Sequence, residues 1–352
     1  MVIKEIIFFL GQKAMDYNFF FKSAVLVKKN KIKIFNLKKP ILKKGQVFVK
    51  ILFSSLCHTQ VQEINGQRGI DKFLPHCFGH EGVGKIIDKD KSVKKINKGD
   101  IVSLSWIKSS GIEAGGVTYT DENNVKVNGG PVHTSGEYAV ISENRIYKLN
   151  SKKNLSSKIL LGCAMSTTYN SLEKFKKEIK KKILILGAGG LGISALIIAN
   201  KLGFSEINIL DKSKKKLRIA KKLGAKNIFE KFENINKQKF DIVLECTGNF
   251  EVLSMAQNYT KNFGGELIII GNYVNKKKIS FDIWPIILGV TISGAWQSNI
   301  LFDKKFKFIE NNILNQNFNH LFGNRIYTIF EFDKILYDLK NNNILRPLIK
   351  NN

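Results

Sequence analysis

The sequence predicts an α/β protein of two parts, a β-rich domain and a domain built on a doubly wound parallel sheet. Its 352 residues exceed the usual size of a single core, so two domains are the default expectation. Short apolar runs broken by glycine dominate up to about residue 149, whereas apolar runs alternate with helical patterns after about residue 162. The first pattern is typical of a partly closed barrel, and the second of a parallel sheet covered by helices.

The expected strands of the first part include 47–52, 82–87 and 100–104. In the second part, residues 182–186 form a continuous apolar run, as in a strand that is buried on both faces. A helix is expected over 193–202. The alternation continues with a helix over 213–223 and with strands at 206–210, 227–229, 240–244, 266–270 and 290–293.

These changes in pattern predict the domain limits. They are an N-terminal extension at 1–16, the β-rich domain at 17–163, the parallel-sheet domain at 164–294, and a return to the β-rich domain at 295–352. The extension carries no motif, and Met15 is a second possible start. We therefore expect residues 1–14 to be peripheral and dispensable.

The formal net charge of +28 would ordinarily suggest nucleic acid or an anionic membrane as a partner. The lysines are scattered through every predicted element, however, so neither partner is expected. No stretch of 18 apolar residues is present, and the first ten residues do not resemble a secretory signal. The four cysteines show no pairing pattern, which predicts reduced thiols and a cytoplasmic location.

A glycine-rich turn from Gly187 to Gly192 joins the buried strand to the helix that follows it. In such a turn Gly187 allows the tight bend, Gly189 lets the backbone approach a pyrophosphate, and Gly192 permits close packing of helix and strand. Gly190 and Leu191 offer N–H groups at the positive end of the helix. The turn therefore predicts a dinucleotide site.

Asp211 ends the next expected strand, 19 residues beyond Gly192. A carboxylate there accepts hydrogen bonds from the ribose hydroxyls of NAD and repels the 2′-phosphate of NADP. NAD is therefore the predicted cofactor, although Lys212 weakens the exclusion of NADP. The alternative is a parallel sheet with an empty glycine turn.

Cys57, His80 and Cys163 form a possible metal-binding set. A catalytic zinc takes three thiolate or imidazole ligands from the protein and keeps a fourth position open. These three residues lie far apart in the sequence, so spacing alone leaves the site undecided. The other candidates are interpreted as packing or surface residues: Cys77, Cys246 and His133.

The order of the motifs makes a resemblance specific. Cys-His-Thr at 57–59, Gly-His-Glu-Gly-Val-Gly at 79–84 and Leu-Gly-Cys-Ala-Met-Ser-Thr-Thr-Tyr at 161–169 precede the glycine-rich turn. The chain resembles the zinc-containing medium-chain alcohol dehydrogenases over residues 20–350. The resemblance implies a GroES-like catalytic domain, a Rossmann NAD-binding domain, and assembly into a homodimer or homotetramer.

The resemblance also implies roles for single residues. Cys57, His80 and Cys163 become the ligands of one catalytic zinc, with Glu81 as an alternating or supporting carboxylate. Thr59 matches the position that passes the alcohol proton outward. The other matches concern cofactor and substrate: His58 and Arg346 near the pyrophosphate, Thr167 by the nicotinamide, and Trp106 in the substrate pocket.

Three departures from the family pattern stand out. The four cysteines of a structural zinc lobe are absent from 108–124, so one zinc per chain is expected. That segment must then be held by packing and backbone hydrogen bonds, with Val117 and Tyr119 as its local core. Gln60 replaces a supporting aspartate and Gln62 a relay histidine, so weaker metal binding and proton exit through water are expected.

The predicted function is a zinc-dependent transfer of a hydride between NAD(H) and an alcohol, aldehyde or ketone. Two alternatives remain: a zinc-free quinone or enoyl reductase on the same scaffold, and a catalytically silent NAD- or RNA-binding protein. The first would lack the three zinc ligands, and an intact ligand set argues against the second. The identity of the alcohol stays open.

Overall fold

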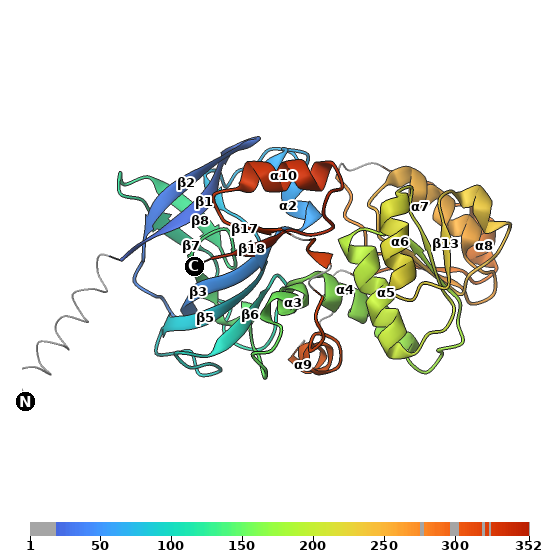
Figure 1. The fold of residues 1–352 in the computed structure, drawn as a ribbon, viewed down its shortest axis with the longest axis horizontal. Helices are drawn as coiled ribbons and strands as arrows, with labels where there is room; N and C mark the ends of the chain where they lie inside the picture. Colours follow the sequence, from blue (N-terminus) through green and yellow to red (C-terminus); the bar gives the residue numbers. More distant parts are fainter. Residues whose placement is uncertain (1–18, 275–277, 296–302, 319–320, 324, 352) are drawn as a thin grey trace, which may run out of the picture. The chain divides into compact units, whose positions relative to one another are not determined.

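The computed structural model describes residues 19–274, 278–295, 303–318, 321–323 and 325–351 (Figure 1). The chain divides into two compact units: the first comprises Met1–Gly162 and Phe318–Asn352, and the second comprises Cys163–Asn317. The expected extension at 1–16, and with it the expectation that residues 1–14 are dispensable, lies outside the described residues. Within the described part of the chain, no helix is long and apolar enough to cross a membrane.

Two sheets form the first unit. Sheet A has the strand order β2–β1–β4–β8–β7, and sheet B has the order β10–β6–β5–β3–β18–β17, with β9 also paired to β3. The strands of sheet A are β1 (Phe20–Lys28), β2 (Lys31–Lys38), β4 (His76–Cys77), β7 (Val117–Thr120) and β8 (Lys126–Gly130). Those of sheet B are β3 (Gln46–Ser55), β5 (Glu81–Lys89), β6 (Ile101–Ser105), β9 (Tyr138–Ser142), β10 (Ile146–Lys148), β17 (Ile326–Tyr327) and β18 (Leu348–Lys350).

The core of the first unit joins the two sheets. Phe21 and Val25 of sheet A pack in one buried cluster with Phe48 and Val140 of sheet B. The rings of Phe21 and Phe48 meet edge to face with centroids 5.9 Å apart, a favourable aromatic geometry. The β-rich domain predicted from the sequence is therefore confirmed.

The second unit is built on a six-stranded sheet in which every neighbouring pair is parallel. Its order is β13–β12–β11–β14–β15–β16. Successive strands are added on one side of β11 up to β13 and on its other side from β14 onward, so the strand order reverses between β11 and β14. Ligands of such sheets bind beyond the carboxyl ends of the strands at this reversal. The doubly wound, Rossmann-type sheet is confirmed, with strands β11 (Ile183–Leu186), β12 (Ile207–Leu210), β13 (Asn227–Phe229), β14 (Ile242–Glu245), β15 (Glu266–Ile269) and β16 (Thr291–Gly294).

Helices connect the strands in both units. The first unit holds α2 (His58–Ile64), α3 (Leu155–Lys158), α10 (Phe332–Lys340), η1 (Glu143–Arg145) and η2 (Ile159–Gly162). The second holds α4 (Ala164–Leu172), α5 (Gly190–Leu202), α6 (Lys214–Lys222), α7 (Phe250–Ala256), α8 (Ile283–Ile287), α9 (Asp303–Asn312), η3 (Glu173–Phe175), η4 (Phe232–Ile235) and η5 (Gln257–Tyr259). In α6 the Ser213 side chain caps the first turn, and only Leu217 and Ala220 of the helix are buried, so its lysines face solvent.

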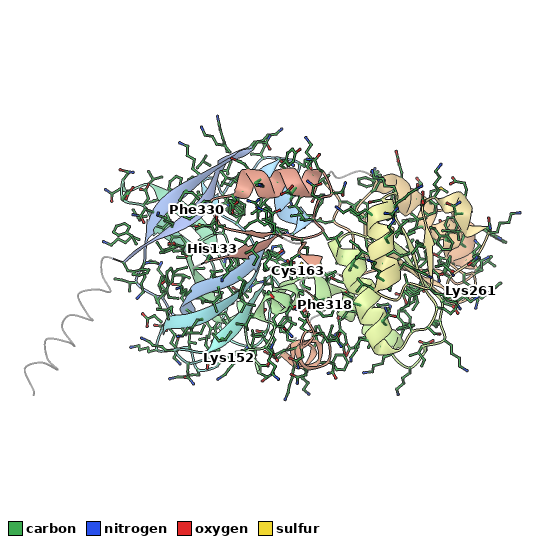
Figure 2. All side chains as sticks on the ribbon, viewed as in Figure 1. His133, Lys152, Cys163, Lys261, Phe318 and Phe330 are labelled. Atoms are coloured by element: carbon green, nitrogen blue, oxygen red, sulfur yellow. The ribbon has the colours of Figure 1, made fainter. Side chains whose placement is uncertain are left out.

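His133 is a packing residue among the strands of the first unit (Figure 2). Its side chain is fully buried, and its Nε2 lies 2.7 Å from the hydroxyl oxygen of Tyr119. That oxygen accepts a hydrogen bond from the Val140 N–H, so the hydroxyl proton is donated to Nε2 and the imidazole is neutral. Burial lowers the pKa of His133 to about 3.

The low pKa of His133 predicts a loss of stability in mild acid. Between pH 6.5 and about pH 3 the unfolded chain binds a proton at this position that the folded chain does not. The free energy of unfolding should therefore fall by about 1.4 kcal/mol for each pH unit below 6.5, and this contribution is fully present only above 6.5. Urea unfolding of the wild type and of His133→Gln between pH 6.5 and 4.5 measures the difference. Equal slopes in the two proteins would contradict the assignment.

Candidate active site

The candidate active site lies along a row of strand ends that forms one edge of sheet B. In the register of the sheet Ser55 pairs with Glu81, and Glu81 pairs with Ser105. Because β3, β5 and β6 are antiparallel neighbours, the end of β3, the start of β5 and the end of β6 share this edge. Cys57 follows β3 by two residues and His80 directly precedes β5, so the sheet itself brings them together.

Four side chains converge at this edge: Cys57, His80, Glu81 and Cys163. Each offers one possible ligand atom, and these atoms all lie within 4.8 Å of one another. The two cysteines are partly exposed and form no disulfide with another described cysteine, whereas His80 and Glu81 are buried. Two sulfurs and an imidazole, with a carboxylate as the fourth group, are the donor types that a catalytic zinc takes.

Cys163 reaches this edge because the residue before it packs on sheet B. The carbonyl of Gly162 accepts hydrogen bonds from Ser105 Oγ at 2.8 Å and from the Trp106 N–H at 3.2 Å. A Cβ atom at Gly162 would lie 2.4 Å from the Leu104 carbonyl oxygen, so a residue with a side chain does not fit there. Cys163 opens the second unit, and its peptide bond to Gly162 places it at the site.

Gln60, from α2, supports His80. The side-chain amide of Gln60 lies 2.7 Å from Nδ1 of His80, and both residues are buried. If Nε2 is to bind a metal, Nδ1 must carry the ring proton and donate it to the amide oxygen. That orientation also gives a partner to the Gln60 oxygen, which has none among the described residues when the amide nitrogen faces His80.

His80 then has one ring nitrogen left for a metal. Its Nε2 is buried and makes no hydrogen bond to any other described residue, as expected of a ligand atom. Burial lowers the pKa of His80, but the adjacent Cys57 and Glu81 raise it, and the net direction is upward. These negative neighbours favour a cation at this point, so the residues fit a zinc ion.

Glu81 forms a buried ion pair with Arg346. The contact joins Glu81 Oε2 to Nη1 of Arg346, and the two side chains are 0% and 6% exposed. A buried carboxylate needs such a partner, because its charge is otherwise costly to remove from water. Arg346 was expected near the cofactor pyrophosphate; its guanidinium lies on Glu81, and the pyrophosphate contact stays a prediction.

The other predicted residues divide into two groups. Thr59 and Trp106 lie at the ligand cluster: the Thr59 hydroxyl is 3.8 Å from Cys57 Sγ, and the Trp106 ring centroid is 6.0 Å from that of His80. His58 is an exposed residue at the start of α2. Thr167 belongs to α4 of the second unit, where its N–H donates to the Cys163 carbonyl at 2.9 Å.

The glycine-rich turn of the second unit lies between β11 and α5. Gly187 has a φ of +99°, which favours glycine, and a Cβ at Gly192 would lie 1.7 Å from the Gly187 carbonyl oxygen. A Cβ at Gly189 would meet no atom within 4 Å, so the backbone there borders open space. Gly190 and Leu191 form the first turn of α5, whose free N–H groups bind anions. The turn fits a pyrophosphate.

Asp211 lies at this turn. One carboxylate oxygen accepts a hydrogen bond from the Ala188 N–H at 2.8 Å, and the other accepts one from the Ser213 N–H at 2.8 Å. Each oxygen has a second lone pair, so the carboxylate can still accept from ribose hydroxyls. Asp211 therefore shapes the turn as well as offering the predicted ribose contact.

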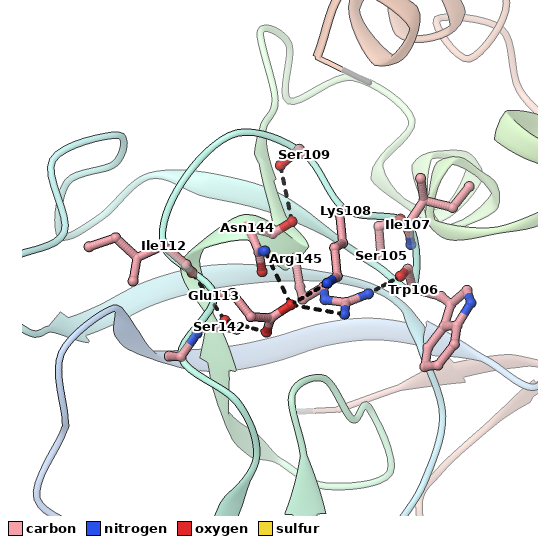
Figure 3. Close-up of polar contacts among 11 residues, drawn as sticks. Ser105, Trp106, Ile107, Lys108, Ser109, Ile112, Glu113, Ser142, Asn144 and Arg145 are labelled. Carbon is pink, nitrogen blue, oxygen red and sulfur yellow. Dashed lines mark hydrogen bonds and ion pairs between the residues drawn. The ribbon is translucent and has the colours of Figure 1, made fainter. Parts of the chain in front are cut away.

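Figure 3 shows an ion-pair cluster that the sequence analysis did not identify. The Arg145 guanidinium donates to the Trp106 carbonyl and pairs with Glu113 at 3.3 Å, and Lys108 Nζ lies 3.0 Å from the same carboxylate. Burial raises the pKa of Glu113, but Lys108, Asn144 and Arg145 outweigh it and lower the pKa to about 2. One signal was available in advance: Arg145 is one of only five arginines among the 57 lysines and arginines of the chain.

The cluster corrects the expectation that only packing and backbone hydrogen bonds hold the segment 108–124. Val117 and Tyr119 are buried, as expected, but they belong to the core between sheets A and B. The stretch before them is fixed by side-chain ion pairs through Glu113. The segment contains no cysteine or histidine.

A second group of possible ligands comprises Glu63, Asp71 and His76. His76 Nδ1 lies 2.9 Å from the Cys77 carbonyl oxygen, and Nε2 lies 2.7 Å from Asp71 Oδ2. Each ring nitrogen of His76 therefore lies at hydrogen-bond distance from an oxygen atom of the protein.

Comparison with known families assigns the chain. A family described as "Alcohol dehydrogenase GroES-like domain" matches residues 43–151, and one described as "Zinc-binding dehydrogenase" matches residues 190–311. Both matches agree with the ligand cluster at the edge of sheet B. The chain belongs to the zinc-binding alcohol dehydrogenases.

This dehydrogenase also resembles individual proteins. The S-(hydroxymethyl)glutathione dehydrogenase of Photobacterium damsela subsp. piscicida is 26% identical over 288 residues, which cover 72% of this chain and 78% of that protein. An alcohol dehydrogenase zinc-binding domain protein from Burkholderia ambifaria has a similar crystal structure, with a TM-score of 0.84 at 21% identity, covering 94% of this chain and 99% of that one. Benzyl alcohol dehydrogenase from Acinetobacter calcoaceticus has a TM-score of 0.78 at 22% identity, with the same coverage.

The family fixes the reaction class. The dehydrogenase is a zinc-dependent, NAD(P)-linked oxidoreductase that acts on alcohols, and the zinc-free and non-enzymatic alternatives do not apply. At position 60 the site has a glutamine where the family pattern has a supporting aspartate. The Gln60 side chain contacts His80 directly.

The contact of Gln60 with His80 predicts how tightly zinc is held. Gln60→Glu places a charged acceptor on Nδ1 of His80 and should tighten zinc binding, whereas Gln60→Met removes the acceptor and should weaken it by about 10- to 100-fold. Competition with a chromogenic chelator measures the affinity of each protein. Gln62→Met, on the same helix and also buried, is the matched control and should bind zinc like the wild type. Equal affinities for the Glu and Met variants of Gln60 would refute the role.

Proposed function

We propose that this dehydrogenase transfers a hydride between NAD(H) and an alcohol, aldehyde or ketone, with one zinc held by Cys57, His80 and Cys163. The observation that carries the proposal is the convergence of the ligand atoms within 4.8 Å. When bound there, zinc would act as a Lewis acid that polarises the substrate oxygen and lowers the pKa of an alcohol hydroxyl. Glu81 would complete the ligand set when no substrate is present.

Thr59 is the proposed proton acceptor. Its hydroxyl lies 3.8 Å from Cys57 Sγ and can accept the alcohol proton while it gives up its own. Gln62 is an amide and does not exchange protons as a histidine would, so the proton leaves through water. When bound, NAD would supply the acceptor for the hydride, which leaves the alcohol carbon with the electron pair of the broken C–H bond. The products are the carbonyl compound, NADH and a released proton.

The proposed cofactor is NAD rather than NADP. The open side of Gly189 and the first turn of α5 support a pyrophosphate at the turn, and the Asp211 carboxylate beside it would repel a 2′-phosphate. Contacts of His58 and Arg346 with the pyrophosphate, and of Thr167 with the nicotinamide, follow from the family resemblance. Because Cys57 and Cys163 must stay reduced to bind zinc, we propose that the protein works in the cytoplasm.

One zinc per chain is expected, and it is required for turnover. The segment 108–124 offers no soft or imidazole ligand, and each ring nitrogen of His76 already contacts a protein oxygen. Elemental analysis should give about one zinc per wild-type chain and almost none in Cys163→Ser, which should also lose NAD-dependent alcohol oxidation. Cys77→Ser is the matched control, since Cys77 lies on β4 outside the ligand cluster, and it should keep both zinc and activity.

Two outcomes would contradict the proposed function. One is a full complement of zinc in Cys163→Ser. The other is unimpaired oxidation of alcohols by protein from which zinc has been removed.

Asp211 is expected to set the choice of cofactor. Asp211→Ser removes the ribose acceptor and the repulsion of a 2′-phosphate, so the ratio of kcat/KM for NAD to that for NADP should fall by at least about tenfold. The control is Asp241→Ser. Asp241 also accepts a backbone N–H, that of Lys182, but it precedes β14 and so lies at the amino ends of the strands, opposite the end that carries Asp211. An unchanged ratio in Asp211→Ser would refute the assignment.

We further propose that the dehydrogenase is a homodimer joined along β16. Among the described strands, β16 pairs only with β15, so its outer edge is open to a second copy. The adjacent α8 exposes apolar side chains: Ile283 is 63% exposed, Trp284 61% and Ile287 63%. An open strand edge beside exposed apolar groups favours self-association.

Sedimentation equilibrium tests this assembly. The wild type should have about twice the chain mass, and Ile287→Asp should shift the protein toward the monomer, because a carboxylate in the interface is costly to desolvate. Ile228→Asp is the matched control, since it lies on β13 at the other edge of the same sheet. A monomeric wild type, or a dimer untouched by Ile287→Asp, would rule out this interface.

A further inference from the structure

Arg145 connects an ion-pair cluster to the residue beside the proposed zinc site. It belongs to η1, between β9 and β10, and is 6% exposed. In Figure 3 its guanidinium lies between the Glu113 carboxylate and the Trp106 carbonyl. The arginine carbon Cζ also lies 5.5 Å from the centre of the Trp106 ring, a cation–π geometry. Both the backbone and the ring of Trp106 therefore contact one buried guanidinium.

The position of Arg145 is itself fixed by its neighbours. The Glu143 carboxylate accepts from three backbone N–H groups, those of Lys94, Lys95 and Ile112. The Ser109 N–H donates to the Asn144 carbonyl at 2.7 Å. These bonds tie η1 to the segment that carries Trp106. The backbone that carries Arg145 is therefore held in place by these hydrogen bonds.

Trp106 in turn stands beside a proposed zinc ligand. Its ring centroid is 6.0 Å from that of His80, and the side chain is 38% exposed. A partly exposed indole is held in one orientation only if another group contacts its ring. The planar guanidinium of Arg145 does so, because it contacts the Trp106 carbonyl, the Glu113 carboxylate and the face of the indole at once. Lysine, with a single compact charge, cannot make these contacts at once.

We propose that Arg145 is a positioning residue that holds the Trp106 indole as a fixed wall of the substrate pocket and so sets which alcohols the enzyme accepts. The substrate pocket in this proposal rests on the proposed function. The contacts between Arg145 and Trp106 do not depend on that function. Arg145 itself does not touch the reacting atoms. Its loss should leave the zinc ligands in place and free the indole to move.

The first test observes Trp106 directly. Protein labelled with 5-fluorotryptophan gives ¹⁹F signals from its three tryptophans, and the Trp106 signal is the one that disappears in Trp106→Phe. Arg145→Met should shift or broaden that signal and leave the other two in place, while Arg145→Lys should restore it in part. Lys108→Met is the matched control, because Lys108 pairs with Glu113 without a recorded contact to Trp106. It should leave the Trp106 signal unchanged.

The second test measures selectivity. The ratio of kcat/KM for a bulky alcohol to that for a small alcohol should change by about tenfold or more in Arg145→Met, in the same direction as in Trp106→Ala, with zinc content unchanged. An unmoved Trp106 signal in folded Arg145→Met, or an equal change in Lys108→Met, would overturn the proposal. If the wild type oxidises no alcohol, the proposed function fails, while the ¹⁹F result still decides whether Arg145 holds Trp106.

Discussion

The two hydrogen bonds to the Gly162 carbonyl connect the fold to the chemistry of the site. They come from Ser105 Oγ and the Trp106 N–H, at the end of β6, and they place the backbone just before Cys163. The register of sheet B aligns the same strand end with Glu81 and with the end of β3. Ligands from three distant parts of the chain therefore take their positions from one row of paired strands.

The requirement for glycine at residue 162 follows from this arrangement. A side chain there would meet the Leu104 carbonyl oxygen at 2.4 Å and force the backbone away from β6. Cys163 would move with it, since the two residues share a peptide bond. The close packing of Gly162 on β6 therefore also fixes the position of Cys163 in the ligand set.

Much of this could be predicted from the sequence. Strands such as 183–186 are apolar at every position because both faces of a parallel sheet are covered, and that pattern is local. The glycine turn was predicted from its place between a buried strand and a helix, whereas the zinc ligand set was assigned through the resemblance to the zinc-containing medium-chain alcohol dehydrogenases, because spacing alone left the site undecided. The fold class follows from local patterns, and the converging zinc ligands and the reaction class follow from the order of the family's motifs.

The contacts around the site could not be predicted in the same way. Arg346 and Glu81 are 265 residues apart, and nothing near either residue indicates the other. Arg145 meets Trp106 only because η1 and the segment after β6 pack together, which depends on the whole of sheet B. Gln60 was recognised as a departure from the family, but its 2.7 Å contact with His80 depends on how α2 packs beside β5. Pairings between loops are decided by tertiary packing and leave no periodic trace in the chain.

The use of arginine has a consequence for how this protein can change. Of its five arginines, Arg145 and Arg346 are buried beside the site, while Arg68, Arg218 and Arg325 are exposed. Two thiolates would balance a bound Zn²⁺, and Glu81 pairs with Arg346, so the formal charge of these groups would sum to zero, although the whole chain carries +28. Exposed charges that lie more than a Debye length, about 8 to 10 Å, from that centre are screened by salt. The chain can therefore gain or lose surface lysines over many generations while the field acting on its substrate stays nearly constant.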